Sequence, residues 1–266
     1  MSRQEIKSMN AYEKVQKARS KDRPTFSFYL NSIFENFYEF HGDRRFADDP
    51  AVIGGVACLQ DMPVTVIGLE KGLDTKDKIK RNFGSANPEG YRKALRLMKQ
   101  AEKFNRPVIC FIDTSGAYCG IGAEERGQGQ AISQNLIEMS SLKCPIIAIV
   151  IGEGGSGGAL ALSVADEIWM LENAVYSVIS PEGCASILWK DAKRAPEAAE
   201  CLKLTAQDLS SLKIIDKIVP ENDFAETANI IKSSLCETIK RLKRLSIDDL
   251  LNNRYLKYRN MGNQFI

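Results

Sequence analysis

The chain has 266 residues, 44% of them hydrophobic, and a formal net charge of +2. This length allows one large buried core or two small ones, and the near-neutral charge disfavours a nucleic-acid-binding protein. The start of the chain lacks an apolar stretch typical of a signal peptide and no later run approaches membrane-spanning length, so we expect a cytoplasmic protein without a membrane anchor.

Cysteine and histidine usage narrows the chemistry further. The seven cysteines are odd in number and no two have Cys-x-x-Cys spacing, which argues against a disulfide framework or a zinc ribbon. We expect buried, unreactive thiols. The single histidine, His41, lies in a polar stretch before the first strand, where we expect a structural or surface role rather than a serine triad or a metal ligand.

The first half of the chain predicts helical and strand elements in turn. Aromatic residues at mixed spacing over 11–40 predict an amphipathic helix. Two β runs, Val52 to Leu59 and Pro63 to Leu69, predict a hairpin. Asn87 and Pro88 favour a helix start, followed by apolar residues at helical spacing. The opposite face of that helix is predicted to carry the basic residues Arg92, Lys93, Arg96, Lys99 and Lys103.

The second half continues the alternation of strand and helix. We predict strands over 107–113, 145–151, 167–171 and 176–179, and helices over 124–142 and 159–165. Thr205 to Asp208 resembles a capping box, and charged helical sequence follows from about Asp223. Continuous apolar strands separated by helices predict an α/β sheet covered on both faces.

Two of the predicted strands end in glycine-rich turns, Asp113-Thr-Ser-Gly-Ala-Tyr-Cys-Gly120 and Gly152-Glu-Gly-Gly-Ser-Gly-Gly158. Glycines at a strand-to-helix junction let bare backbone N–H groups face a ligand, and the helix start adds a positive dipole end. We interpret both as anion-stabilising turns.

The second turn has two other interpretations. Gly152, Gly154 and Gly157 satisfy the dinucleotide fingerprint, with Glu172 at the expected distance. Two features of this motif disfavour nicotinamide binding. The motif lies in mid-chain, and Gly158 stands where the helix of a dinucleotide fold should already have begun. A purely structural interpretation, in which the glycines only permit tight packing, also stays open.

Several long blocks stand together in order along the chain. They are Arg81 to Gly84, Pro88 to Lys99, Asp113 to Tyr118, Ala123 to Gln128, Gly152 to Leu160 and Ser177 to Lys190. Over about residues 10–220 the chain resembles the carboxyltransferase α subunits of bacterial acetyl-CoA carboxylase.

That resemblance implies a crotonase-like fold, a spiral of ββα units. We expect an N-terminal helical extension over 1–45, a carboxyltransferase core over 46–220 and C-terminal helices over 221–266, acting as a single functional domain. The implied reaction moves a carboxyl group from carboxybiotin, held on a biotin carboxyl carrier protein, to acetyl-CoA. It yields malonyl-CoA, in the first step of fatty-acid synthesis. The resemblance further implies a β subunit, an α2β2 heterotetramer, and zinc on the β partner only.

By the same resemblance, the backbone N–H groups of Gly157 and Gly158 form the biotin-side oxyanion hole. Gly116 and Ala117 form the neighbouring wall, and Gly154, Gly155 and Ser156 complete the substrate-binding turn. Decarboxylated biotin serves as the base in this scheme. Asp113, Glu153 and Glu182 are therefore expected to hold the turns rather than to move protons.

The chain departs from the family pattern in two places. Ser115 and Cys119 replace prolines of the first turn, which loosens the constraint on the loop, and a Gly-Gly-Ala-His block is absent after Pro220. Two alternatives remain: a non-catalytic paralogous subunit that scaffolds a β partner, and a carboxyltransferase for another acyl-CoA.

The segment 71–106 is strongly basic, with eleven Lys or Arg residues against four Asp or Glu. A solvated helix face is the default interpretation. Attraction of CoA phosphates or of the carrier domain is the functional interpretation, and the lack of interleaved aromatic residues for stacking disfavours nucleic-acid binding.

Overall fold

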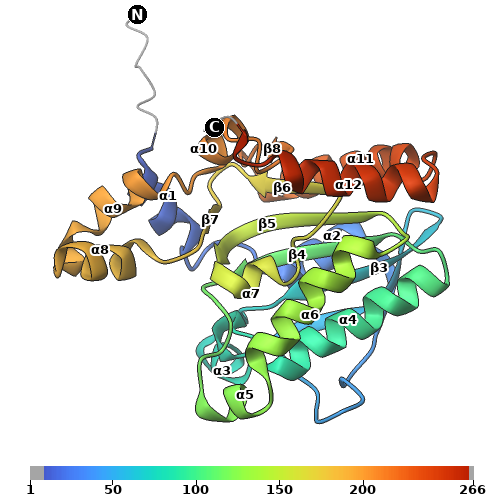
Figure 1. Cartoon of the computed structure of the whole chain (residues 1–266), viewed down its shortest axis with the longest axis horizontal. Coiled ribbons are helices and arrows are strands. Elements are labelled where there is room, and N and C mark those ends of the chain that lie inside the picture. The colour runs from blue at the N-terminus through green and yellow to red at the C-terminus, as the bar shows by residue number, and fades with distance from the viewer. Residues whose placement is uncertain (1–8, 264–266) are drawn as a thin grey trace, which may run out of the picture.

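The computed structural model describes residues 9–263, and its centre is one mixed β-sheet (Figure 1). The strands run in the order β1-β2-β3-β4-β5-β6-β8, with β7 beside the end of β5. The first three strands pair antiparallel and the others parallel. Their bounds are β1 Glu35–Glu39, β2 Val52–Leu59, β3 Met62–Leu69, β4 Val108–Thr114, β5 Ile146–Gly155, β6 Glu167–Leu171, β7 Val175–Ser177 and β8 Lys217–Val219.

Helices cover both faces of the sheet. Figure 1 shows α4 and α6 side by side on one face, α11 and α12 along the opposite side, and α1, α8 and α9 in a lobe beyond β7. The bounds are α1 Ala11–Ala18, α2 Phe26–Ile33, α3 Thr75–Lys80, α4 Pro88–Lys103, α5 Ile121–Glu125, α6 Gln128–Ser141, α7 Ser156–Leu160, α8 Pro181–Trp189, α9 Ala195–Leu202, α10 Ala206–Ser211, α11 Phe224–Leu242 and α12 Ile247–Asn260. Within residues 9–263, no helix combines the length and apolar character needed to cross a membrane.

The predicted α/β sheet, the hairpin and the helix at Pro88 are confirmed. β4 is buried along its whole length and β5 is buried from Ile146 to Gly152, because helices cover both of their faces. One residue of α4 was assigned to the wrong face: Lys93 is fully buried rather than exposed. Its ammonium group donates to Asp48 and to the carbonyl of Asp49, so the charge is paired inside the protein.

Three predicted helices were wrong in extent. Residues 11–40 form α1, α2 and the edge strand β1 rather than one helix. The helix predicted over 124–142 is broken into α5 and α6, because Gly127 adopts a left-handed conformation with φ 82°. The helix predicted over 159–165 begins earlier and ends sooner, as α7, and the strand predicted over 145–151 continues through Gly155 as β5.

A buried arginine joins the C-terminal helices to the sheet. Arg254 of α12 is only 1% exposed and forms an ion pair of 2.8 Å with Asp166. Its guanidinium also donates to the carbonyls of Met139, Leu142 and Cys144, at and just beyond the C-terminal end of α6. The positive charge therefore caps the negative end of that helix and neutralises a buried carboxylate.

Replacing this arginine is expected to be costly. Arg254→Met leaves Asp166 charged and buried without its partner, so the free energy of unfolding should fall by about 3 to 5 kcal/mol. Arg259→Met, on an exposed position of the same helix, should change it by less than about 0.5 kcal/mol. Chemical denaturation of both variants measures the difference. Equal stabilities would show that Arg254 does not anchor α12.

Candidate functional site

The two glycine turns lie side by side, because they follow the paired strands β4 and β5. Thr114, the last residue of β4, pairs with Gly154 of β5. The first turn is held by its own residues: the Thr114 hydroxyl donates to the carbonyl of Gly116 (2.9 Å) and accepts from the Gly116 N–H (3.1 Å). Gly116 has a φ of 152°, which favours glycine.

The main chains of the two turns touch directly. A Cβ atom on Gly155 would lie 2.1 Å from the carbonyl oxygen of Ser115, and a Cβ atom on Gly158 would lie 2.4 Å from the backbone nitrogen of Ala117. Both distances are far below any permitted contact. Gly155 and Gly158 are therefore required so that one turn can pack against the other.

Two more glycines of the second turn are also explained by packing. A Cβ atom on Gly152 would meet the Asp113 carboxylate at 2.3 Å, and one on Gly154 would meet the Tyr176 ring at 2.7 Å. A Cβ atom on Gly157 would find only the Ile132 side chain at 3.7 Å, an ordinary contact. Packing thus explains why four positions of this turn require glycine. It does not explain Gly157, where a Cβ atom would fit without a clash.

The first turn of α7 presents unpaired N–H groups. Helix starts leave their first N–H groups without intrahelical partners. Among the described residues, no protein acceptor pairs with the N–H groups of Gly157, Gly158 or Ala117. Ser156, just before them, has a φ of 49°, a conformation that costs roughly 1–2 kcal/mol for a residue with a side chain. This strained junction turns the chain sharply from β5 into α7.

Two clefts flank this turn. Gly157 and Ser156 line an apolar cleft of about 350 Å³ together with Leu160, Tyr176, Val178, Leu202, Leu209 and Ile214. Gly154, Gly155 and Ser156 line a smaller one on the side of α1 and β7. Gly116, Ala117 and Gly158 line neither cleft and lie behind the turn at its contact with the first turn. Of the predicted site residues, Gly157 is thus the N–H donor placed at the larger cleft.

A chain of ion pairs clamps the ends of the strands. The Lys71 ammonium, after β3, lies 2.7 Å from Asp113 and 3.0 Å from Glu153. Arg19, after α1, continues the chain to Glu153 at 2.7 Å and to Glu182 at 2.8 Å. Asp113, at the start of the first turn, also accepts a hydrogen bond from the N–H of Glu153 at 2.8 Å. Its carboxylate therefore caps the second turn and not the first.

These pairs fix the charges of the buried groups. Burial alone would lower the pKa of Lys71, but Asp113 and Glu153 outweigh it and raise that pKa above its usual value. Burial would likewise raise the pKa of Glu153, but Lys71 and Arg19 hold it below its usual value. Both groups therefore stay charged near neutral pH. They can hold the strand ends together by ion pairing, but they are not suited to transfer protons.

Sequence reasoning missed part of this neighbourhood. Lys71 entered only as a member of the basic segment, and Arg19 was not singled out, because their partners come from distant parts of the chain. Tyr91 of α4 is one of the apolar residues that recur at helical spacing after Pro88. Its hydroxyl is fully buried, has no partner among residues 9–263, and would lie 3.0 Å from a Cβ atom on Gly158. Burial raises its pKa well above the usual range, so the hydroxyl stays protonated.

The dinucleotide interpretation is not supported by the fold. Gly152 and Gly154 lie within β5, and α7 spans only Ser156–Leu160, too short to be the helix of that motif. Neighbouring strands from β1 to β6 also follow the chain order, without the reversal that creates a dinucleotide crevice.

The single histidine and two of the cysteines lie on the protein surface. His41 is exposed, with Nδ1 2.8 Å from Asp48. Cys119 and Cys201 are exposed, which corrects the expectation that the thiols are buried. In the part of the chain that the structure describes, no three His, Cys, Asp or Glu side chains are grouped to hold a metal ion.

The segment after Pro220, which lacks the Gly-Gly-Ala-His block, has a structural role here. The side chains of Glu221 and Arg23 are almost fully buried and lie 2.8 Å apart. Glu221 also accepts from the N–H of Asn173 at 2.6 Å, and Arg23 donates to the carbonyl of Ile151 in β5. This glutamate therefore ties the end of β8 to the N-terminal segment.

Comparison with known proteins adds independent information. The acetyl co-enzyme A carboxylase carboxyltransferase-like family matches residues 1–262. The chain is 65% identical to the acetyl-coenzyme A carboxylase carboxyl transferase subunit alpha of Ruminiclostridium cellulolyticum, over 96% of this chain and 98% of the relative. It is 61% identical to the subunits beta/alpha chain of Natranaerobius thermophilus, over 98% of this chain and 44% of that longer relative.

Solved structures show the same fold at low identity. A transcarboxylase 12S structure matches with a TM-score of 0.67 at 17% identity, over 86% of this chain and 44% of that chain. A Pseudomonas malonate decarboxylase hetero-tetramer in complex with coenzyme A matches with a TM-score of 0.63 at 16% identity, over 79% of this chain and 86% of that chain. These likenesses confirm the crotonase-like α/β fold.

The contact between the two turns predicts a contrast between neighbouring glycines. Gly158→Ala places a methyl group against the Ala117 backbone and should lower the free energy of unfolding by about 1 to 3 kcal/mol. Gly157→Ala has room and should be neutral, or stabilising by up to about 1 kcal/mol. Chemical denaturation compares the two. If both variants matched the wild type, the turns would not be in backbone contact.

Proposed function

Because the chain belongs to the acetyl co-enzyme A carboxylase carboxyltransferase-like family, and is thus an α-type subunit of a biotin-dependent carboxyltransferase, we propose that its α7 turn stabilises the charge that develops during carboxyl transfer. One observation carries this proposal: the N–H groups of Gly157 and Gly158 start a helix without an acceptor among residues 9–263. Gly157 also opens onto an apolar cleft.

Carboxyl transfer develops negative charge on two oxygens. The thioester oxygen of acetyl-CoA becomes negative when its methyl carbon loses a proton, and the ureido oxygen of biotin becomes negative when the carboxyl group leaves. Fixed N–H donors stabilise such charge without reorganising, and each is typically worth about 2.7 to 4 kcal/mol. We assign the donors of α7 to the ureido oxygen, since the apolar cleft beside Gly157 suits the apolar part of the biotin ring.

The charged side chains around the turns do not compete for this role. Asp113, Glu153 and Glu182 are each held in ion pairs with Lys71 or Arg19. They orient the two turns, and the two cations balance all but one of the three carboxylate charges. Proton removal from acetyl-CoA is therefore left to the biotin ring, which supplies the base once its carboxyl group has departed.

The partner proposal rests on one relative and on exposed apolar residues. The Natranaerobius thermophilus relative joins beta and alpha subunits in one chain, so the two act together in that protein. Val178, which lines the cleft at Gly157, is 75% exposed, and Ile187 and Leu188 of α8, in the lobe beyond β7, are each 63% exposed. We propose that a β subunit covers this patch in an α2β2 assembly, carries the zinc, and completes the acetyl-CoA site. The biotin carboxyl carrier protein would then deliver carboxybiotin at the seam.

An activity assay separates this proposal from a purely scaffolding subunit. The chain is purified with its β partner, and malonyl-CoA decarboxylation and carboxyl transfer to free biotin are measured. Turnover is expected with malonyl-CoA. A stable complex without turnover on any acyl-CoA would identify a scaffold, and turnover only with a different acyl-CoA would identify another substrate.

Removing one donor should reduce turnover without preventing assembly. A semisynthetic chain in which an ester oxygen replaces the Gly157 N–H lacks this donor but places no new constraint on Ser156, whose φ is 49°, so carboxyl transfer should fall about 100- to 1,000-fold. Gly157→Ala keeps the N–H and is the matched control, expected within about threefold of the wild type. Co-elution with the β partner checks the fold of both. Equal activity of the two variants would remove Gly157 from the site.

A further inference from the structure

A second groove lies apart from the glycine turns, between α4, α6 and the loop over 41–47. It has a volume of about 500 Å³, within the range of small-molecule sites. Its wall carries five cationic side chains, Arg44, Arg45, Arg92, Arg96 and Lys99, against the single carboxylate of Asp43. None of its lining residues lines either cleft at the α7 turn.

Three of these cations have no carboxylate to balance them. Arg92 pairs with Asp43 at 2.7 Å, and Lys99 pairs with Glu138 at 2.8 Å. In contrast, Arg44, Arg45 and Arg96 make no ion pair within residues 9–263. The groove therefore keeps an uncompensated positive charge although the whole chain is nearly neutral.

Two of the free guanidinium groups are held in place by the same loop. Arg44 donates to the carbonyl of His41 at 2.7 Å, and Arg96 donates to the carbonyl of Gly42 at 3.1 Å. Burial, and to a smaller extent the nearby charge of Arg44, lower the pKa of Arg96, although the carboxylates of Asp48 and Asp43 act in the opposite direction. Positioned guanidinium groups with spare N–H donors match the geometry of phosphate oxygens.

The helix beside the groove adds to this preference. α6 starts after Gly127, which has no side chain to cap it, and Gly127 and Gln130 line the groove. In residues 9–263, the N–H groups of Gln128, Gly129 and Gln130 find no protein acceptor. Such an uncapped helix start favours an anion.

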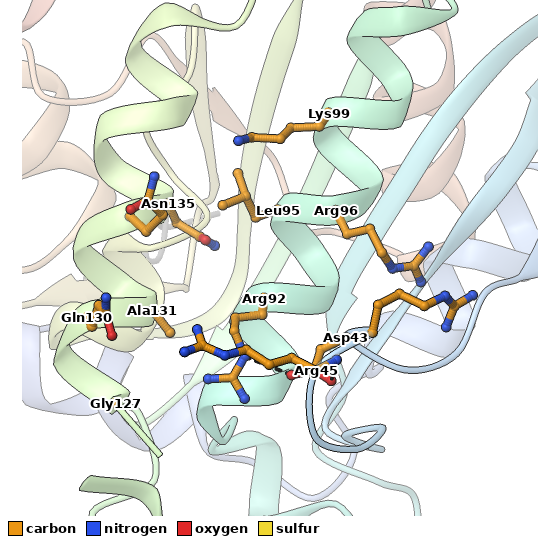
Figure 2. A pocket seen from close by; sticks show the side chains of 12 residues that line it. Asp43, Arg45, Arg92, Leu95, Arg96, Lys99, Gly127, Gln130, Ala131 and Asn135 are labelled. Atoms are coloured by element: carbon orange, nitrogen blue, oxygen red, sulfur yellow. Dashed lines mark hydrogen bonds and ion pairs between the residues drawn. The ribbon is translucent and has the colours of Figure 1, made fainter. Parts of the chain in front are cut away.

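The floor of the groove is apolar. Leu95 is 8% exposed and Ala131 is 5% exposed, and Figure 2 shows them between the two helices, with Arg45 and Arg92 near one end and Lys99 reaching from α4 toward α6. An apolar floor beside several cations fits a ligand with phosphates at one end and a flat organic group at the other. A bare inorganic anion would leave the floor unused.

We propose that this groove binds the diphosphate of a nucleotide-sized ligand, with Arg45 and the start of α6 on the phosphates and the organic part over Leu95 and Ala131. Arg44 and Arg96, which their bonds to the loop and, for Arg96, Figure 2 place on the loop side of α4, add positive charge to the same end. Such phosphates are carried both by coenzyme A and by free nucleotides. The site is separate from the α7 turn, so it does not depend on the oxyanion hole proposed there.

Binding to the full-length chain tests the proposal. Isothermal titration calorimetry should show saturable binding of ADP, of coenzyme A or of both, with inorganic pyrophosphate binding more weakly, while adenosine should not bind. Arg45→Gln should weaken that binding about tenfold, the loss expected for one charge-assisted hydrogen bond, and Arg96→Gln should weaken it less, since it removes only nearby positive charge. Arg244→Gln changes an exposed arginine that lines no part of the groove and should leave the affinity unchanged.

The relative affinities of these ligands show whether the bound phosphates belong to coenzyme A or to a free nucleotide. Coenzyme A binding more tightly than dephospho-coenzyme A and ADP would assign the groove to the coenzyme, while ADP binding as tightly as coenzyme A would assign it to a free nucleotide. Absence of binding by all three probes would overturn the proposal, and so would an equal loss in Arg244→Gln and Arg45→Gln. Turnover is not part of this measurement, so failure here leaves the α7 proposal intact.

Discussion

The site depends on direct contact between two main chains at the ends of β4 and β5. Side chains at Gly155 or Gly158 would collide with the backbone from Ser115 to Ala117. Without those side chains, the second turn can rest on the first and enter α7 through the strained Ser156. The free N–H groups of α7 are thus placed by packing of the backbone, which rotamer changes cannot alter.

The ion pairs around the turns serve the same end by another means. Lys71 joins the ends of β3, β4 and β5 through Asp113 and Glu153, and Arg19 extends the link to Glu182 at the start of α8. Largely buried charges such as those of Lys71 and Asp113 are costly unless paired, so each restricts where the other can lie, while the pair of Arg19 and Glu182 is more exposed. The arrangement orients the turns while leaving the chemistry to main-chain donors and to the substrates.

The sequence predicted those features that depend on local pattern. The hairpin of β2 and β3, the start of α4 at Pro88, and the first glycine turn follow from turn residues, periodicity and glycine placement. The second glycine turn was wrong in extent, because β5 continues through Gly155 and α7 begins at the next residue. Features that depend on distant partners were missed or wrong. Lys93 was assigned to the exposed face because its partners, Asp48 and Asp49, come from another segment. The division of the glycines into four that pack and one that faces a cleft likewise required the tertiary contacts.

The central claim is that main-chain N–H groups at the start of α7 stabilise the developing charge. Its most direct measurement is the carboxyl-transfer rate of a semisynthetic chain in which ester oxygens replace the N–H groups of both Gly157 and Gly158. This change adds no side chain, so the contact with Ala117 is kept. The account predicts a loss of at least about 100-fold with the β complex still assembled. A rate within about threefold of the unmodified chain would contradict it.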